Sequence, residues 1–320
     1  MGKKTKIWLL AAAALVLLGG ILFTVVMTVL GWDLAKLSAA RYETNTTEIT
    51  GNIFNISINA DTADIALVYS EDGECKVECY ERADEPHSVE VIDGALTVVR
   101  SEKKSFLNYI GFNFGSPKIT VYLPHTDYDL LQIEASTGDI EVAKEFRLLD
   151  ADISLSTGDV RFYAFVYNTL KIGGSTGDIY VEDISAGRLD LSVSTGKVTA
   201  KNVDCGGDVT VGVSTGKAYL TDIACKNLNT SGDTGDLSLS NVIATEKFSI
   251  ERSTGDVKLE GCDAAELSVQ TDTGDVTGSL LTSKVFITET DTGRVEVPKT
   301  VTGGKCEITT DTGDIKIEIK

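Results

Sequence analysis

A four-residue pattern of Ser/Asp-Thr-Gly-Asp/Lys/Arg recurs ten times between residues 136 and 314. Its glycines are always 19 or 20 residues apart, at Gly138, Gly158, Gly177, Gly196, Gly216, Gly235, Gly255, Gly274, Gly293 and Gly313. Such regular self-similarity is typical of repeat proteins, in which each unit packs only on its neighbours. The repeat constrains the fold of this chain more than any other feature of the sequence.

Apolar residues keep fixed positions relative to each repeated glycine. The residue two positions after it is apolar in all ten units, and further apolar columns precede and follow it at alternate positions. Apolar and polar residues alternate in this way along a half-buried β-strand. Each unit therefore predicts a strand, a turn at the glycine, a second strand and a second turn. The glycine is expected to adopt a conformation that is costly for residues with a Cβ.

Units of 19 or 20 residues are too short for the four strands of a propeller blade. They suit one coil of a solenoid, in which equivalent positions stack about 4.8 Å apart, so ten coils would extend about 48 Å. We expect an all-β chain with a β-helix-like β-solenoid of about ten coils over residues 131–320. Residues 51–130 carry only a degenerate copy, Asp61-Thr62-Ala63-Asp64, and are expected to form irregular first coils and a cap.

The N-terminal segment contains a long uncharged run. Residues 7–30 are 24 positions without a charge, and a helix of that length spans about 36 Å, enough to cross a bilayer core. A cleavable signal peptide is the alternative, but its apolar stretch is normally about 7–15 residues. We therefore expect a basic cytoplasmic segment at 1–6, a transmembrane anchor at 7–32 and a polar stalk at 33–50.

The distribution of charge supports this arrangement and excludes some partners. Lys3, Lys4 and Lys6 precede the apolar run, so the positive-inside rule places the rest of this single-pass chain outside the cell membrane. The chain has a net charge of −19, and because those lysines are the only charged residues of 1–32, residues 33–320 carry −22. A nucleic acid is not expected as a partner, because its phosphates would be repelled. A membrane is expected as a partner through the helix, and an unknown surface protein or glycan through the repeats.

The run ITVYLPHTDYDLLQIEASTGDIEV at 119–142, with the repeats that follow, resembles a bacterial family of β-strand-repeat proteins. The family is a domain of unknown function labelled "putative adhesin", and the resemblance covers about residues 50–320. It implies a repeat β fold, often behind one transmembrane helix. Lys197, Lys217 and Arg294 depart from the usual Asp after the glycine, which interrupts a continuous ladder of carboxylates.

Catalytic chemistry is not expected. Nucleophilic catalysis needs a base that a third group positions, and the two histidines, His87 and His125, lie in no recognisable motif. Carboxylates are abundant, but an aspartate that recurs in every coil serves the turn first. No cofactor is expected. Weak calcium sites are conceivable where a coil offers two carboxylates, at Asp233, Asp236, Asp272, Asp275, Asp311 and Asp314.

Two aromatic clusters, in SFLNYIGFNFGS and RFYAFVYN, are candidates for contact with a partner. Half of each cluster is expected to fill the core, and the outward half to anchor an interface. The candidate contact residues are Tyr109, Phe112, Phe114, Tyr163 and Tyr167.

The leading functional hypothesis is an extracytoplasmic binding or adhesion module. An envelope-stress sensor or accessory protein that contacts a membrane partner is the alternative, and an enzyme that cleaves envelope glycans is the third.

The cysteines test the alignment of the coils. Cys205 and Cys225 both follow their repeat glycine by nine residues, so they are expected on adjacent coils with Cα atoms about 4.8 Å apart, within disulfide reach. Cys75 and Cys79 are separated by about 13 Å if their segment is extended. Cys262 and Cys306 occupy apolar columns and are expected to be buried thiols.

Overall fold

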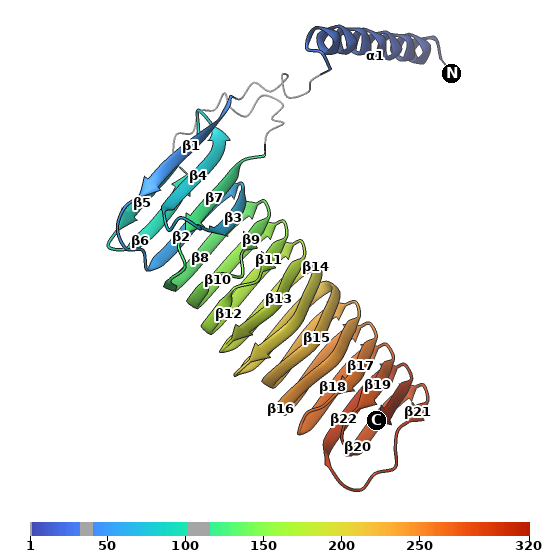
Figure 1. Ribbon diagram of the computed structural model, residues 1–320. Coiled ribbons are helices and arrows are strands. Elements are labelled where there is room, and N and C mark those ends of the chain that lie inside the picture. The colour runs from blue at the N-terminus through green and yellow to red at the C-terminus, as the bar shows by residue number, and fades with distance from the viewer. Residues whose placement is uncertain (1, 33–40, 101–115) are drawn as a thin grey trace.

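The computed structural model describes residues 2–32, 41–100 and 116–320, which form one helix and a 23-stranded β-solenoid (Figure 1). The helix, α1, spans Lys3–Val29. The strands stack as the rungs of a rod, and nearly all neighbouring rungs are parallel and in register. The predicted all-β solenoid of about ten coils is confirmed.

Each regular coil has one strand before its Thr-Gly turn and one after it. Strands that precede a turn are β8 (Asp127–Thr137), β10 (Arg147–Thr157), β12 (Phe165–Thr176), β18 (Glu266–Thr273), β20 (Lys284–Thr292) and β22 (Gly304–Thr312). Strands that follow a turn are β9 (Ile140–Val142), β11 (Val160–Phe162), β13 (Ile179–Ala186), β17 (Val257–Cys262), β19 (Val276–Leu280), β21 (Val295–Glu296) and β23 (Ile315–Ile319). Three long strands contribute both to the strands that precede a turn and to those that follow one: β14 (Arg188–Cys205), β15 (Asp208–Thr234) and β16 (Leu237–Thr254).

The cap combines one regular coil with antiparallel strands. The coil consists of β2 (Asn55–Thr62) and β3 (Asp64–Tyr69), joined at the degenerate turn. The other cap strands are β1 (Tyr42–Ile49), β4 (Cys75–Arg82), β5 (His87–Ile92), β6 (Ala95–Arg100) and β7 (Lys118–Leu123). β4 pairs antiparallel with β1 and β7, and β5 pairs antiparallel with β6. Because β1 is a strand, the predicted polar stalk is wrong over 42–49; residues 33–40 lie outside the described part of the chain.

The order of the coils in space differs from their order in the chain at both ends. The first coil, β2 and β3, lies between β6 with β7 on one side and β8 with β9 on the other. The last coil, β22 and β23, likewise lies between β18 with β19 and β20 with β21. The first and last coils in chain order thus have neighbours on both edges, which protects β2, β3, β22 and β23 from fraying.

The core is one continuous apolar column along the rod. The residues two positions after the repeat glycine, such as Ile140, Val198 and Leu237, are fully buried, as the alignment predicts. The exception is Val295, 42% exposed, because its coil ends the stack. Cys262 and Cys306 are also fully buried, so the prediction for these two thiols is confirmed.

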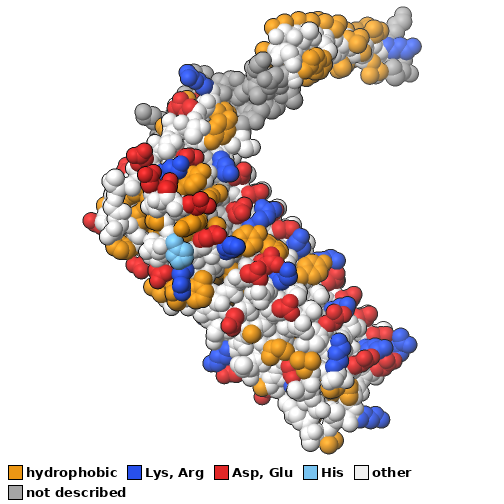
Figure 2. All heavy atoms as spheres, in the orientation of Figure 1, with side chains coloured by type: hydrophobic (Ala, Val, Ile, Leu, Met, Phe, Trp, Pro, Cys, Tyr) orange, Lys and Arg blue, Asp and Glu red, His pale blue; other side chains and the backbone are white. Residues whose placement is uncertain are grey.

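The helix α1 differs in surface from the rod. Beyond the lysines at its N-terminal end, its side chains are mostly apolar and exposed, whereas basic and acidic side chains are mixed over the visible face of the rod (Figure 2). By length and composition, residues 4–29 are capable of crossing a membrane, with a mean hydropathy of 2.7. A signal sequence near an N-terminus meets the same criterion of length and composition.

Candidate binding surface

The repeated turns bring the backbones of neighbouring coils into contact. Nine of the ten repeat glycines have φ between 126° and 156°, a region that L side chains rarely adopt. A Cβ at Gly177 would lie 1.9 Å from the carbonyl oxygen of Gly158 on the preceding coil. Both the backbone conformation and the space therefore require glycine at the turn. Gly293, on the outermost coil, lacks the positive φ but has the same close contact, with Gly313.

The aspartate after the glycine links each coil to the next. Oδ1 of Asp139 accepts a hydrogen bond of 2.9 Å from the backbone N–H of Asp159, and Oδ1 of Asp159 accepts one of 2.8 Å from Asp178. The ladder begins at the degenerate turn, where Asp64 accepts from the N–H of Asp139. A carboxylate that accepts a backbone N–H makes a charge-assisted bond that is stronger than a neutral one. The recurring aspartate therefore has a structural role in the turn.

The basic residues that interrupt this ladder are paired with it. Lys197 forms an ion pair of 2.9 Å with Asp178, and Lys217 one of 2.8 Å with Asp236. Arg294 contacts Asp314 through both its backbone N–H and its guanidinium. The hydrogen bond from Lys217 lowers the pKa of Asp236. The pKa of Asp314 is lowered by the hydrogen bonds from the backbone and side chain of Arg294. The surface is thus a mixed ladder and carries no continuous acidic stripe.

The calcium candidates lie in this ladder. Asp233, Asp272 and Asp311 are exposed, and Asp236, Asp275 and Asp314 each accept a backbone N–H from a neighbouring coil. Within the described residues, the one group of three metal-ligating side chains that converges is Cys79, Glu81 and His87, in the cap. The aspartate pairs stay candidates for weak binding only.

A second ladder, which the sequence reasoning missed, lies six residues after the glycine. Asp183, Asn202, Asp222 and Asn241 all have φ between 51° and 56°. Asn and Asp tolerate this left-handed conformation better than other residues with a Cβ. The amide of Asn202 donates to Asp183, and that of Asn241 to Asp222. The recurrence of Asp or Asn at one position of the repeat was a readable signal for this turn.

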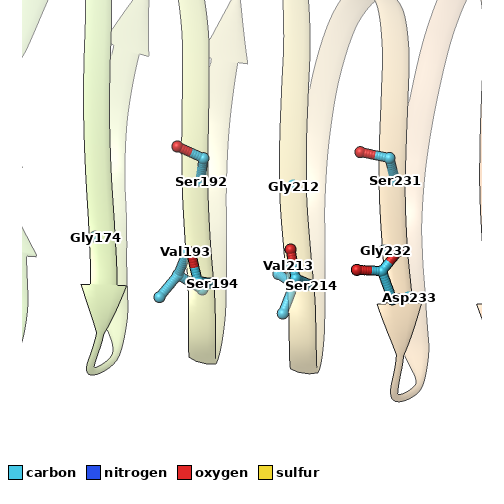
Figure 3. A pocket seen from close by; sticks show the side chains of 10 residues that line it. All are labelled: Gly174, Ser192, Val193, Ser194, Gly212, Val213, Ser214, Ser231, Gly232 and Asp233. Carbon is cyan, nitrogen blue, oxygen red and sulfur yellow. The ribbon is translucent and has the colours of Figure 1, made fainter.

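A shallow polar groove lies on the regular coils, before the turns (Figure 3). We call it the serine–glycine groove. It has a volume of about 230 Å³ and is lined by Gly174, Ser192, Val193, Ser194, Gly212, Val213, Ser214, Ser231, Gly232 and Asp233. These residues come from β12, β14 and β15 and occupy equivalent positions on four successive coils. The groove exists because small residues, Ser192 and Gly212, occupy the outward position, and because Gly174 leaves the inward position beside Val193 without a side chain.

A buried arginine lies against the floor of this groove. Arg252 occupies an inward position of β16 and is 3% exposed. Its Nη1 donates a hydrogen bond of 3.4 Å to the carbonyl oxygen of Val213, two coils away, and would lie 1.9 Å from a Cβ at Gly232. Gly232 is therefore needed to admit the guanidinium. Its Nε and Nη2 are buried without a hydrogen-bond partner in the described structure. Burial lowers the pKa of this guanidinium from its usual value, against the opposing charges of Asp233 and Asp236.

The aromatic candidates have different environments. Tyr167 is 41% exposed, and its ring packs edge-on against Phe165 at 4.6 Å between centroids. The guanidinium of Arg147 lies over both rings, at 5.5 Å and 5.7 Å. Tyr163 is half-buried and packs edge-on against Tyr180. The structure thus places two separate aromatic pairs at the surface, whereas Tyr109, Phe112 and Phe114 lie outside the described residues.

Comparison with known proteins identifies relatives by fold. The chain resembles a crystal structure named a "putative lipid binding protein" from Parabacteroides distasonis, with a TM-score of 0.51, 15% identity, and coverage of 87% of this chain and 98% of that chain. It also resembles a "putative adhesin" from Parabacteroides merdae, with a TM-score of 0.51, 13% identity, and coverage of 86% and 97%. No curated protein sequence matches this chain.

The family comparison covers nearly all of the rod. A model of the Toastrack family of unknown function, DUF4097, matches residues 53–212 and 204–320. These two matches together span the cap from β2 onward and the regular coils, and they leave out the N-terminal helix and β1. The earlier resemblance, drawn from the Leu-Pro strand and the repeated turns, is confirmed. The chain belongs to the Toastrack DUF4097 family.

Proposed function

We propose that this chain is a membrane-anchored binding module that holds its rod outside the cell and binds envelope glycans in the serine–glycine groove. The anchor is supported by α1, which carries its only charges at its N-terminal end, before the apolar run. Three lysines at that end favour a cytoplasmic N-terminus. Binding in place of catalysis agrees with the names of the two structural neighbours, an adhesin and a lipid binding protein.

The groove is the observation that carries this proposal. Hydroxyl groups of Ser192, Ser194, Ser214 and Ser231 and the carboxylate of Asp233 face it (Figure 3). Hydroxyls both donate and accept hydrogen bonds, which matches the hydroxyl groups of a sugar. Because equivalent side chains recur about every 4.8 Å along the rod, a polymer lying along the groove meets a similar set of groups at each coil. The polar lining favours such a ligand over an acyl chain.

The surface aromatic pairs offer further contact with sugars. Tyr167 and Phe165 present an exposed aromatic edge beside a cationic guanidinium. An aromatic ring combines a large apolar face with, in tyrosine, a polar handle, which suits an interface that is partly wet. These rings are fixed on strands of a solenoid, so they lose little conformational freedom when a ligand binds.

Filling the groove tests the proposed ligand site. Gly212 has no positive φ, and a Cβ there would make only ordinary contacts at 3.8 Å, so Gly212→Gln should fold normally and block the groove. Binding of the full-length protein in nanodiscs to soluble cell-wall glycan fragments should weaken at least about tenfold, a loss of about 1.4 kcal/mol. Gly206→Gln is the matched control, because a Cβ at Gly206 has nothing within 4 Å and lies outside the groove. Equal binding by both variants would refute the groove as the site.

The topology is tested separately. Protease added to intact cells from which the wall has been stripped should digest the repeat domain. A tag placed before Lys3 should stay protected until the membrane is permeabilised. Complete protection of the repeats would refute the extracytoplasmic assignment without bearing on the groove.

A further inference from the structure

We propose that the cap contains a zinc site formed by Cys79, Glu81 and His87. One ligand atom from each of these side chains lies within 4.8 Å of the other two. The set comprises a thiol, a carboxylate and an imidazole, which together are typical of tetrahedral zinc. Neither the groove nor the repeated turns use any of these residues.

Two strands bring the ligands together. Cys79 and Glu81 are two residues apart on β4, so their side chains share the inner face of the cap, where both are 2% exposed. His87 begins β5, directly after the turn that follows β4, and 6% of its side chain is exposed. The site therefore lies at the connection from β4, which pairs with β7, to β5, which pairs with β6, so an ion would join these two strand pairs of the cap.

The hydrogen bonds around Glu81 resemble the supporting shell of a metal site. The amide of Asn45, on β1, donates to Oε1 of Glu81 at 2.8 Å. The backbone N–H of His87 donates to Oε2 at 2.7 Å, and Nδ1 of His87 lies 2.6 Å from the same oxygen. Bonds of this kind orient ligating carboxylates and imidazoles and are important for metal affinity. Asn45 and the turn backbone thus fix the carboxylate before any ion arrives.

Cys79 distinguishes the cluster from a simple buried pair of Glu81 and His87. It packs in the apolar core as other buried cysteines of the rod do, but its free thiol also lies within 4.8 Å of a ligand atom of each of the other two side chains. A zinc ion bound by a thiolate, a carboxylate and a neutral imidazole has no net charge, so it is compatible with burial. On binding, the Cys79 thiol proton leaves to solvent, and the ion replaces the hydrogen bond between Nδ1 of His87 and Oε2 of Glu81, with the imidazole proton held on Nε2. A water molecule completes the four ligands.

Cobalt provides a direct probe, because its spectrum reports both tetrahedral geometry and thiolate ligation. Full-length protein in detergent, stripped with a chelator, should bind one equivalent of Co²⁺ with tetrahedral d–d bands and a thiolate charge-transfer band, and Zn²⁺ should abolish both. Cys79→Ser should lose the charge-transfer band, and His87→Gln should weaken Co²⁺ binding at least about tenfold. The matched controls are Cys75→Ser, on the same strand, and His125→Gln, the other histidine; both should bind as wild type.

Zinc K-edge absorption on the wild-type protein provides a readout that does not depend on the folding of any variant. It should show one sulfur and otherwise nitrogen and oxygen neighbours, at about 2.3 Å and 2.0–2.2 Å. A folded wild-type protein without a stoichiometric cobalt spectrum would overturn the proposal. Sulfur-free coordination of the bound zinc would overturn it as well, as would a charge-transfer band that survives in Cys79→Ser.

Discussion

The backbone N–H of Asp178 donates a hydrogen bond of 2.8 Å to Oδ1 of Asp159, its equivalent on the neighbouring coil. The same relationship recurs along the rod, so the aspartate of the turn forms a bond between coils and not within one. A carboxylate here satisfies a backbone donor that the strand ladder leaves free, because the strands stop at the turn. Where Lys197 and Lys217 replace aspartate, β14 and β15 continue through the turn and their backbones pair directly.

Removing one rung of this ladder should destabilise the rod. Asp159→Ala leaves the N–H of Asp178 without its acceptor and should lower the free energy of unfolding by about 1–2 kcal/mol. Asp159→Asn keeps an acceptor oxygen and should cost less than half as much. Urea denaturation of residues 41–320, followed by circular dichroism, measures both. Asp204→Ala is the control, because Asp204 is exposed and outside the ladder; a loss there equal to that of Asp159→Ala would contradict the prediction.

Adding a single methyl group at a repeat turn should be more damaging. In Gly196→Ala the new Cβ lies 1.9 Å from the carbonyl oxygen of Gly177, in a backbone with φ of 148°. The two coils must separate or the turn must change conformation, so we expect a loss above about 3 kcal/mol or failure to fold. Gly206→Ala, where a Cβ meets nothing within 4 Å, should unfold at nearly the wild-type urea concentration. Similar behaviour of the two variants would show that the turn is more adaptable than the structure indicates.

The Lys217–Asp236 pair gives a prediction for pH. The pKa of Asp236 is lowered from 3.8, chiefly by the hydrogen bond from Lys217. The Asp236 carboxylate therefore stabilises the fold fully above the pKa that Asp236 has in the unfolded chain. This stabilisation is lost as the pH falls through the lower pKa that Asp236 has in the folded protein. Lys217→Met should therefore raise the pKa of Asp236 and reduce stability at pH 6 more than at pH 2. The pair is exposed and screened by solvent, so the effect on stability should be small.

Carbon-detected NMR of the Asp236 carboxyl and urea midpoints at several pH values measure this effect. The raised pKa of Lys217 implies a matching loss of stability at alkaline pH, as the pH rises through the folded pKa. The exposed Lys144, on a distant coil, provides the control as Lys144→Met. An unchanged Asp236 pKa in Lys217→Met would show that the ion pair does not persist in solution.

Most of what repeats from coil to coil could be predicted from the sequence, although the second ladder was missed, and what does not repeat could not be predicted. The apolar columns and turn glycines depend on contacts between equivalent positions, which a fixed period records. The exchanged order of the coils at the ends cannot be predicted from the repeat period. Thr312 pairs with Thr273 on one side and with Thr292 on the other, and these are equivalent positions whatever the order of the coils. Arg252 was missed although alignment on the glycine places it among inward residues such as Val213. The cap cluster joins residues across an irregular turn, for which no repeat supplies an alignment.

Calcium should bind weakly at the acidic coils. The coils of Gly274 and Gly313 are adjacent, so Asp272, Asp275 and Asp314 lie close together. However, Oδ1 of Asp275 accepts the N–H of Asp314 at 2.7 Å, and Asp314 is engaged by Arg294. A dissociation constant above about 1 mM is expected. Calorimetric titration of residues 41–320 checks this, and sub-millimolar binding that is lost in Asp272→Asn with Asp275→Asn would contradict it.

Oxidation should link Cys205 to Cys225 ahead of any other cysteine pair. Asp204 pairs in register with Ala224, so the next residues, Cys205 and Cys225, occupy equivalent positions on adjacent coils. Both are at most 4% exposed, yet both line a surface depression of about 340 Å³ through which a small oxidant can approach. Disulfide geometry accepts Cα separations of about 4.4–6.8 Å, which includes the spacing of adjacent coils. The sulfurs must first rotate, because Cys205 donates to carbonyl oxygens of Gly187 and Asp208, and Cys225 to that of Ile243.

The rate of this reaction should depend on pH, because the thiolate is the reactive form. Burial raises the pKa of Cys225 to about 12 and that of Cys205 in the same direction, so cross-linking should be slow at pH 7 and accelerate about tenfold per pH unit up to pH 9. Mild oxidation of residues 41–320 followed by peptide mass mapping measures the yield. Cys225→Ser should abolish the product, whereas Cys262→Ser should leave it unchanged, because Cys262 is buried in the core. A dominant link between Cys205 and Cys262 would show that the coils in solution do not have the register in which Asp204 pairs with Ala224.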